Sequence, residues 1–368
     1  MRPVPRPSLA LERLARQQLA APRFARPEDI VRWFGAVQAQ DQPGACWAIG
    51  QRLPDAVEAD VEAAVAARRI VRTWPMRGTL HYVAAEDAGW MLRLLAPRVI
   101  ARAASRYREL GLDDAAFKKA RALSVKALRG GRALTRPALY EAFARGGVSP
   151  EGQRGLHLLG HLAQQCHLCF GPRQGKQPTV VLFEEWLPAR DDPPRDEALA
   201  RLAARYFASH GPATLADFAW WTGLPVGEAR RAIAAAGAEL TSGAGGAAVL
   251  FAAAQQPARL PRGPLAALLP PWDELLVAYR DRSAPTAALP ARRRDMIIGR
   301  PLLVVDGLVR GAWRRERGKA AVRVDVELWT ALAAAERRAV EAAAERYGRF
   351  LGTRVLLRIS SSASRRSP

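Results

Sequence analysis

Apolar residues recur at helical spacing along the first part of the chain. They predict an amphipathic helix over residues 8–20 and a second helix that begins at Pro27, where a proline and two acids suit a first helical turn. The second helix is expected to end near Gln38, shortly before a Pro-Gly break. A further helix is predicted over residues 45–53.

The pattern then changes to β-branched and aromatic types around a Met-Arg-Gly turn. Residues 70–83, IVRTWPMRGTLHYV, therefore predict a β-hairpin, and residues 85–110 predict a closing helix. Helices followed by a hairpin describe a winged helix. We expect residues 1–111 to form a first winged-helix unit.

The same order of elements recurs twice, without strict sequence identity. We expect a second winged-helix unit over residues 112–193 and a third over 194–260. In each of these repeats a threonine, Thr135 or Thr214, precedes an apolar helical pattern and suits the N-cap of that helix.

From residue 261 the chain is rich in short apolar or alternating segments. The strands predicted here are LLVAY, MIIG, PLLVVDGLVRGAW, AAVRVDVEL and TRVLLRI, with one helix over residues 331–348. Residues 261–359 are therefore expected to form a β-rich, barrel-like domain, either a small barrel or a curled sheet, and residues 360–368 a disordered tail. The predicted fold class is α+β, with tandem winged helices and this C-terminal domain.

The charge of the chain points to a polyanionic partner. Its 368 residues include 56 basic and 35 acidic ones, for a net charge of +21, and only five of the basic residues are lysine. A GC-rich gene explains why arginine is more frequent than lysine, but it does not explain why basic residues outnumber acidic ones. Because arginine suits bidentate phosphate contact, nucleic acid is the expected partner.

Other compartments and cofactors find little support. No apolar run is long enough to cross a membrane, and the N-terminus lacks the apolar core of a signal peptide, so we expect a cytoplasmic, nucleoid-associated protein. Three cysteines do not make a disulfide framework, and Cys166 and Cys169 lack the second half of a zinc site. His157 and His161 stand four apart on a predicted helix without an acidic third ligand, so a solvent or core role is expected over a metal pair. We expect no metal and no cofactor.

The stretch VQAQDQP, residues 37–43, places three glutamines at alternate positions. On a helix, residues two apart point about 200° apart, so Gln38 and Gln40 could not share a site. In an extended segment the same two side chains face one side. The alternative is a polar helix terminus whose amides cap carbonyl groups or face water.

Four separated segments resemble one family in their order along the chain. VQAQDQPGACWA, VRTWPMRGTLHYVAAEDAGWMLRLLAPR, LLPPWDELLVAYRDR and PLLVVDGLVRGAW resemble the AlkZ-like winged-helix DNA glycosylases. That resemblance implies tandem winged helices around a basic channel, and hydrolysis of the N-glycosidic bond of alkylated purines, including bulky adducts and interstrand crosslinks. It also implies that Gln38 and Gln40 match the catalytic Gln-apolar-Gln signature. Ala39 is smaller than the usual apolar residue there.

Two neutral amides suit this chemistry. An N7- or N3-alkylated purine is already cationic, so its departure needs little protonation and its transition state resembles an oxocarbenium ion. Side-chain carbonyls can hold a water molecule and face the growing positive charge. Glycosidases with poor leaving groups use carboxylates instead, so the neutral pair predicts a restriction to activated, cationic lesions.

Several basic residues are candidate DNA contacts. Arg77 and His81 lie on the predicted hairpin near the glutamines, where they either meet phosphates or form a solvated strand face with a hydrogen-bonded histidine. Basic side chains in the linker that follows LLVAY either contact the DNA backbone or form a solvated loop. These linker residues are Arg280, Arg282, Arg292, Arg293 and Arg294.

We therefore predict a monofunctional DNA glycosylase, acting as a monomer on double-stranded DNA that contains alkylated purines. Lyase activity is not expected, because no lysine stands in the catalytic stretch. The rival is a noncatalytic winged-helix DNA-binding protein such as a transcriptional regulator, which would prefer one sequence rather than a lesion. A metal-dependent nuclease is weakly supported, since no acidic cluster stands beside a basic patch.

Overall fold

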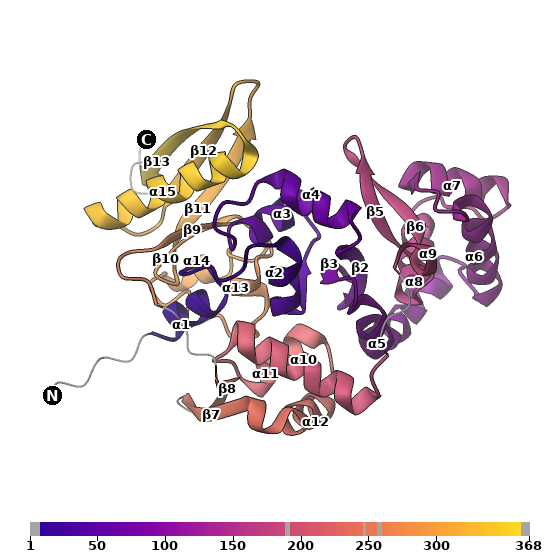
Figure 1. The fold of residues 1–368 in the computed structure, drawn as a ribbon, viewed down its shortest axis with the longest axis horizontal. Helices are drawn as coiled ribbons and strands as arrows, with labels where there is room; N and C mark the ends of the chain where they lie inside the picture. Colours follow the sequence, from indigo (N-terminus) through magenta and orange to yellow (C-terminus); the bar gives the residue numbers. More distant parts are fainter. Residues whose placement is uncertain (1–7, 188–191, 246–247, 256–259, 362–368) are drawn as a thin grey trace.

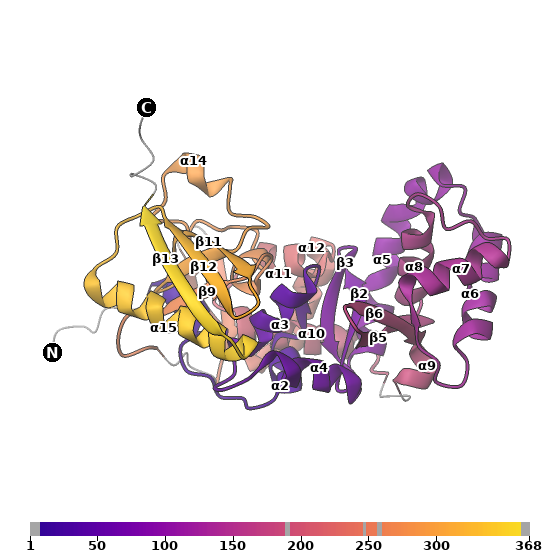
Figure 2. The same ribbon diagram turned by 90° about the horizontal axis from the view of Figure 1, so that it is seen from above.

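The structure is a computed structural model that describes residues 8–187, 192–245, 248–255 and 260–361. The elements of the expected first unit lie at the centre of the molecule (Figure 1). Helices α6, α7 and α8 lie to one side of them, α10 to α12 below them, and the C-terminal strands with α15 on the opposite side. Figure 2 shows the same arrangement from above, with α14 projecting from the C-terminal part.

The central part begins with helices and ends with a hairpin and a long helix, as predicted. Its elements are α1 (Leu9–Arg16), α2 (Pro27–Phe34), β1 (Ala36–Gln38), α3 (Gln42–Gly50), α4 (Glu58–Ala66), β2 (Ile70–Met76), β3 (Thr79–Ala84) and α5 (Ala88–Glu109). Helix α2 ends at Phe34 rather than near Gln38. Gly35, with φ of 79°, turns the chain there into strand β1, a conformation that glycine adopts without strain.

The second part joins the first through a single sheet. Its elements are α6 (Asp114–Leu128), β4 (Leu134–Thr135), α7 (Arg136–Arg145), α8 (Arg154–Gln164), β5 (Leu168–Gln174), β6 (Gln177–Leu182) and α9 (Phe183–Trp186). The strand order is β1-β3-β2-β5-β6-β4, and β2 pairs with β5 where Arg72 faces Phe170. The two hairpins are thus continuous, although the pattern of the chain had placed them in separate units. As expected, Thr135 caps α7, and its hydroxyl accepts a hydrogen bond from the amide of Ala138.

The third part consists of three helices and a two-stranded sheet: α10 (Arg195–His210), α11 (Leu215–Thr222), α12 (Val226–Ala236), the short helix η1 (Gly237–Glu239), β7 (Leu240–Gly245) and β8 (Ala248–Ala253). Thr214 caps α11 as predicted, and Asp217 completes a reciprocal capping box. Strand β7, LTSGAG, was not predicted, because its small residues lack the bulky side chains that signal a strand.

The C-terminal part contains β9 (Ala266–Leu269), α13 (Glu274–Val277), α14 (Ala291–Arg294), β10 (Leu302–Val305), β11 (Leu308–Arg317), β12 (Ala321–Leu328), α15 (Ala334–Leu351) and β13 (Arg354–Ser361). The last three predicted strand segments and the helix are present. Residues 275–279 were predicted as a strand and lie largely in α13, since a short apolar run cannot distinguish the two. Residues 296–299 were predicted as a strand and form none.

The predicted barrel is wrong. Within the described ranges, the C-terminal strands form an open sheet in the order β13-β12-β11-β10-β9, whose edges do not meet. Strand β13 returns parallel to β12 after the crossover through α15, so it extends the sheet instead of closing it. Strand β13 also includes residues 360 and 361 of the expected tail, and residues 362–368 lie outside the described part.

The central part packs against all the others. One core joins α2, α3 and α4 to the C-terminal sheet and α15, and there Trp47 lies against the ring of Tyr347 with centroids 4.9 Å apart. A second core joins α5 and β2 to α10, α11 and α12, and a third joins β2 and β3 to the second part. The segment that carries the glutamines therefore sits where the other parts meet.

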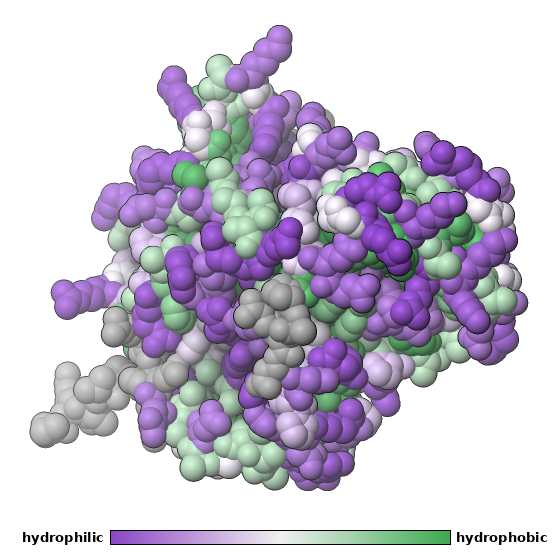
Figure 3. Space-filling model, turned by 45° about the vertical axis from the view of Figure 1, so that its right-hand side comes forward, coloured by the Kyte–Doolittle hydropathy of each residue, from purple (hydrophilic) through white to green (hydrophobic). Residues whose placement is uncertain are grey.

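The outer surface is mainly polar. The face in Figure 3 is largely hydrophilic, with smaller hydrophobic areas between the polar side chains. Among the described helices, none combines the length and the apolar character needed to cross a membrane.

Candidate active site

The segment between the two glutamines is extended and fixed on both sides. Gln38 ends strand β1 and faces His81 of β3. At the next residue, the amide of Ala39 donates to the carbonyl of Leu80 at 2.7 Å, and the Nε atom of Arg72 donates to the carbonyl of Ala39 at 3.0 Å. The extended conformation is confirmed for Gln38, to which the helix-terminus alternative does not apply, whereas Gln40 lies in a bend just before α3.

The two glutamine side chains bond to the same end of the β2–β3 hairpin. Oε1 of Gln38 accepts from Nη2 of Arg77 at 2.9 Å. Oε1 of Gln40 accepts from the backbone amide of Leu80 at 3.2 Å. Gln38 is 8% exposed, whereas Gln40 is an exposed residue. One end of the hairpin, from the turn at Arg77 to Leu80 in the first residues of β3, therefore orients both amides.

These bonds leave acceptor capacity on both amides. The donors Arg77 and Leu80 can bond only to an oxygen, which fixes the orientation of each carboxamide group. A carbonyl oxygen has two lone pairs, so each glutamine keeps one after its bond to the protein. The segment thus offers two oriented, neutral acceptors.

Arg77 and His81 lie in the hairpin as predicted, but their surroundings differ from those of a phosphate contact. His81 has no exposed surface. Its Nε2 lies 3.2 Å from Nη2 of Arg77 and must accept, so Nδ1 carries the proton and donates to the carbonyl of Thr79 at 2.9 Å. Burial, and next the charge of Arg77, lower the pKa of His81 to about 3. The histidine is therefore neutral and hydrogen-bonded inside the protein, but it does not lie on the solvated strand face that the alternative expected.

Arg77 connects the hairpin to the third part of the chain. Besides Gln38 and His81, its guanidinium group donates to the backbone carbonyl of Trp221 in α11. Its three partners are protein atoms. Arg77 therefore holds Gln38 in place, and its contact with DNA stays a prediction.

A buried carboxylate that the sequence analysis did not single out completes this network. Oε1 of Glu274 accepts from the backbone amide of Gln38 at 2.8 Å, and Oε2 accepts from the indole of Trp221 at 3.0 Å. Nε2 of His210 lies 3.4 Å from Oε2. Burial alone would raise the pKa of Glu274, but the nearby His210 and the charge of Arg77 outweigh it and lower the pKa to about 2. Glu274 is ionised at neutral pH.

Asp273, the residue before Glu274, is also buried but pairs with a different side chain. Asp273 forms a two-bonded ion pair with Arg52, at 2.7 and 2.9 Å, and both side chains are at most 2% exposed. This pair ties the end of α3 to the start of α13. Two adjacent acids inside the apolar stretch LLPPWDELLVAY, in a chain with excess base, were the available signal for buried, partnered carboxylates.

The predicted linker arginines fall into two groups. Arg280, Arg292 and Arg294 are exposed. Arg282 is half-buried, with its guanidinium 5.5 Å from the ring centroid of Trp220, and Arg293 lies 5.0 Å from that of Trp329. All five belong to the segment between α13 and β10, and their contact with DNA stays a prediction.

A cavity of about 740 Å³ opens beside Gln40. We call it the Gln40 cavity. It lies between the first two parts of the chain, where α5 and α8 face the hairpin and the joined sheet. Its walls include Gln40, Asp41, Gln42, Arg72, Trp74, Leu80, Tyr107, Arg136, His157, Gly160, His161, Gln164 and Phe170. His157 and His161, for which a solvent or core role was expected over metal binding, both line this cavity, and no group of three or more metal-binding side chains occurs in the described residues.

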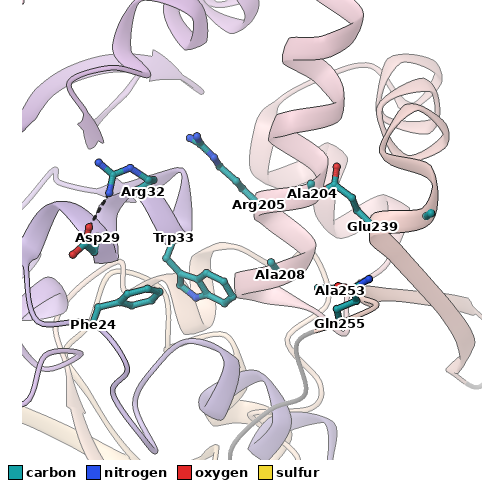
Figure 4. Close-up of a pocket in the computed structure, with 11 residues that line it drawn as sticks. Phe24, Asp29, Arg32, Trp33, Ala204, Arg205, Ala208, Glu239, Ala253 and Gln255 are labelled. Carbon is teal, nitrogen blue, oxygen red and sulfur yellow. Dashed lines mark hydrogen bonds and ion pairs between the residues drawn. The ribbon is translucent and has the colours of Figure 1, made fainter.

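Another cavity, of about 550 Å³, lies between α2 and the third part and contains neither glutamine. Figure 4 shows Phe24 and Trp33 along its wall, next to the ion pair of Asp29 and Arg32. Arg205, which also lines it, pairs with Asp87. Because its cations are already paired with acids, this cavity offers little to a polyanion.

Comparison with known proteins places the chain in one family. A family model described as DNA glycosylase AlkZ-like matches residues 31–350. An interstrand DNA cross-link repair glycosylase from Streptomyces sahachiroi is 28% identical over 226 residues, which are 58% of this chain and 59% of that protein. The alignment thus spans less than two thirds of that relative. The solved structure of Streptomyces sahachiroi DNA glycosylase AlkZ is similar, with a TM-score of 0.78 and 25% identity, covering 96% of this chain and 98% of that one. Since the family model spans most of its length, the chain belongs to the AlkZ-like DNA glycosylase family.

Proposed function

We propose that this protein is a monofunctional DNA glycosylase that releases alkylated, cationic purines from double-stranded DNA. The substrate class is N7-alkylguanine and N3-alkyladenine, including bulky adducts and interstrand crosslinks. The observation that carries this proposal is the Gln-Ala-Gln segment, whose two amides are held by one end of the β2–β3 hairpin. Family membership supports glycosylase chemistry over the alternative of a noncatalytic regulator.

In this proposal Gln38 and Gln40 are the catalytic residues. Their remaining lone pairs hold a water molecule on the face of the deoxyribose away from the departing base. The carbonyl dipoles also face the positive charge that develops on the sugar. Attack of the water forms the new C–O bond as the C–N bond to the alkylated purine breaks, and the proton from water passes to solvent.

The buried network supplies the fixed geometry for this step. Glu274 holds the backbone of Gln38, and Arg77 holds its side chain. The carboxylate of Glu274 offsets the charge of Arg77, so Gln38 is oriented without adding a net positive charge close to an oxocarbenium-like sugar. No carboxylate in this network is aimed at the leaving group, which suits a base that departs without protonation.

The exposed arginines would hold the DNA. Arg280, Arg292 and Arg294 are free of burial and lie in one segment of the basic chain, as backbone contacts require. We assign no DNA contact to His81, because it has no exposed surface.

The test is alkali-revealed strand cleavage of a duplex that contains a single N7-methylguanine. Wild type should produce abasic sites, and Gln38→Ala and Gln40→Ala should each lower the single-turnover rate by about 100-fold while DNA affinity changes little. Gln153→Ala, a surface glutamine at the start of α8, is the matched control and should retain the wild-type rate. Binding without release, or equal rates in the two Gln variants and wild type, would refute the proposal.

A further inference from the structure

We propose that Trp220 and Arg282 form a stacking platform for an undamaged nucleobase next to the lesion, in the damaged strand or in the opposite one. The inference rests on the proposed function and deepens it by adding a contact with the DNA around the lesion. Trp220 lies in the last turn of α11, and Arg282 lies in the segment after α13. Neither residue lines the Gln40 cavity.

Trp220 differs from the other aromatic residues in its exposure. Every phenylalanine, tyrosine and tryptophan of the chain lies in the described part, and among them Trp220 alone is exposed, at 47%. Its neighbour Trp221 has no exposed surface, and its indole bonds to Glu274. The two adjacent tryptophans thus point in different directions. The indole of Trp220 is therefore the largest aromatic surface that the described chain offers to a partner.

Backbone carbonyl groups at the end of α13 hold both side chains of the platform. The indole nitrogen of Trp220 donates to the carbonyl of Val277 at 3.1 Å, and Nε of Arg282 donates to the carbonyl of Leu276 at 2.9 Å. The guanidinium carbon lies 5.5 Å from the centroid of the indole ring, within the range of a cation–π contact. The ring is therefore oriented before a ligand binds, which lowers the entropy cost of stacking.

The platform is attached to the network that holds Gln38. The guanidinium group of Arg77 bonds both to the side chain of Gln38 and to the carbonyl of Trp221, the residue next to Trp220. The Cα atoms of consecutive residues are only about 3.8 Å apart. Figure 2 shows α11 between α14 and the β2–β3 hairpin. A nucleotide whose sugar reaches Gln38 therefore has its neighbours in the DNA close to Trp220.

A nucleobase can meet the indole only when one of its faces is free. Bases inside a regular duplex are stacked on both faces. Bringing the sugar of a damaged nucleotide to the glutamines distorts this stack and frees a face of an adjoining or opposite base. Because every base has a π face, stacking on tryptophan does not depend on sequence. This property suits a protein that acts on a lesion in any sequence context.

Arg282 supplies a positive charge beside the stacked base. The acids whose charges act on its guanidinium group are Asp217 and Asp281. Both have other partners, since Asp217 pairs with Arg13 and Asp281 accepts from Ser283. The charge of Arg282 thus remains available to a phosphate group, and its flat guanidinium group can stack on the indole at the same time.

The experiment measures equilibrium binding by fluorescence anisotropy in a Gln38→Ala background, which keeps the lesion intact during the titration. The duplex carries one N7-methylguanine with cytosine opposite. Trp220→Ala should weaken binding about 10-fold, as expected for the loss of one base–aromatic stack. Trp220→Phe keeps a ring in this place and should stay within about three-fold of the parent. Equal losses in the two variants, or no loss in either, would overturn the inference.

Removing single bases from the DNA identifies the base that stacks. A tetrahydrofuran residue replaces, in turn, the cytosine opposite the lesion and each of the two nucleotides that flank the lesion. In the duplex that lacks the stacked base, Trp220→Ala should change affinity by no more than about two-fold, since no stack is left to lose. The position of that duplex assigns the base to one strand. A full effect of Trp220→Ala on all three duplexes would contradict stacking on a base.

Trp33 provides the matched control. It is half-buried, its indole donates to the carbonyl of Arg16 at 3.0 Å, and the guanidinium carbon of Arg23 lies 4.8 Å from its ring centroid. It lines the cavity that contains neither glutamine. Trp33→Ala should therefore bind every duplex as the parent does. If it weakens binding as much as Trp220→Ala, general loosening of the fold explains both losses and the inference is wrong.

The charge of Arg282 has its own variant. Arg282→Met keeps an apolar side chain against the indole but removes the charge. The slope of log K against log salt should become less negative by about 1, as for one lost phosphate contact. Trp220→Ala should leave this slope unchanged, because stacking releases no counterions. An unchanged slope in Arg282→Met would contradict the phosphate contact.

Failure of the proposed function would have a different signature. These titrations do not depend on base release, so an inactive wild type would refute the glycosylase proposal while the expected affinities stay the same. An active wild type whose Trp220→Ala variant binds all duplexes with unchanged affinity would reject the platform and leave the proposed function standing.

Discussion

The two glutamines have different surroundings at the two ends of their segment. On the side of Gln38, Arg77 bonds to the side chain of Gln38 and to His81, and the buried carboxylate of Glu274 accepts from the backbone amide of Gln38. On the side of Gln40, the protein opens into a large cavity. We call the surroundings of Gln38 the closed side and those of Gln40 the open side. The closed side fixes the position of Gln38, and the open side leaves room for a ligand. The difference indicates that buried contacts hold Gln38, whereas Gln40 can meet a ligand directly.

The largest effect should come from breaking the closed side. Glu274→Gln keeps the size of the side chain but removes the charge that offsets Arg77 and weakens the bond to the amide of Gln38. We expect release of N7-methylguanine to fall by about 100-fold, because misplaced catalytic dipoles lose most of their effect. The single-turnover rate, measured where the variant is folded by circular dichroism, checks this.

Asp273→Asn is the control for that variant. It breaks an equally buried ion pair, with Arg52, that makes no bond to either glutamine. Stability should fall by about 3 kcal/mol, since an unpaired buried charge remains. The release rate of the folded protein should not change. If Asp273→Asn slows release as much as Glu274→Gln does, general loosening and not the position of Gln38 explains both.

A smaller effect should follow from Arg77→Met, which removes the donor to Oε1 of Gln38 but leaves Glu274 bonded to its backbone. We expect release to fall by about 10-fold, corresponding to 1.36 kcal/mol in the barrier. DNA affinity should remain near the wild-type value, because the guanidinium group bonds only to protein atoms in the contacts described above. A large loss of affinity at an unchanged rate would instead support the phosphate role first predicted for Arg77.

The neutral state of His81 makes the closed side sensitive to acid. Its pKa of about 3 lies below the ordinary value of 6.5, so between these pH values the unfolded chain binds a proton that the folded protein does not. The free energy of unfolding should therefore decrease as pH falls below about 6.5, by up to about 1.4 kcal/mol per pH unit. His81→Gln should reduce this slope. Comparing the slopes of the two proteins in urea separates His81 from His161 and His210, whose pKa values burial also lowers.

The smallest effect should come from the exposed arginines. Removing Arg292 and Arg294 together by alanine substitution should weaken DNA binding in 0.1 M salt without changing the ratio of affinities for damaged and undamaged duplex. Each lost phosphate contact should make the slope of log K against log salt less negative by about 1. An unchanged slope would mean that these residues form a solvated loop.

Sequence patterns predicted the features that depend on residues close together in the chain. The caps at Thr135 and Thr214, the β2–β3 hairpin and the strands from β10 onward were all readable, because each depends on neighbouring residues. The glutamine pair came from resemblance and from the need for an extended segment. Strand β1 was hidden because its three residues follow a helix, and only pairing with β3 makes them a strand.

What the sequence could not give depends on contacts between distant residues. Glu274 meets Gln38 across 236 positions, and the aromatic wall of the Gln40 cavity joins residues of both early parts. The apolar run that includes Leu275 and Leu276 reads equally well as strand or helix, and the cap at Asp273 decides for helix. The barrel was wrong because closure depends on how the edge strands meet, which alternation along a strand does not encode.

The most direct test of the account is a double-mutant cycle on single-turnover release of N7-methylguanine, with Gln38→Ala, Glu274→Gln and the two combined. If Glu274 acts by positioning Gln38, the double variant should be within about three-fold of Gln38→Ala alone, since no amide is left to position. If the two losses multiply, Glu274 contributes independently of Gln38, and the claim that the closed side works through this glutamine is contradicted.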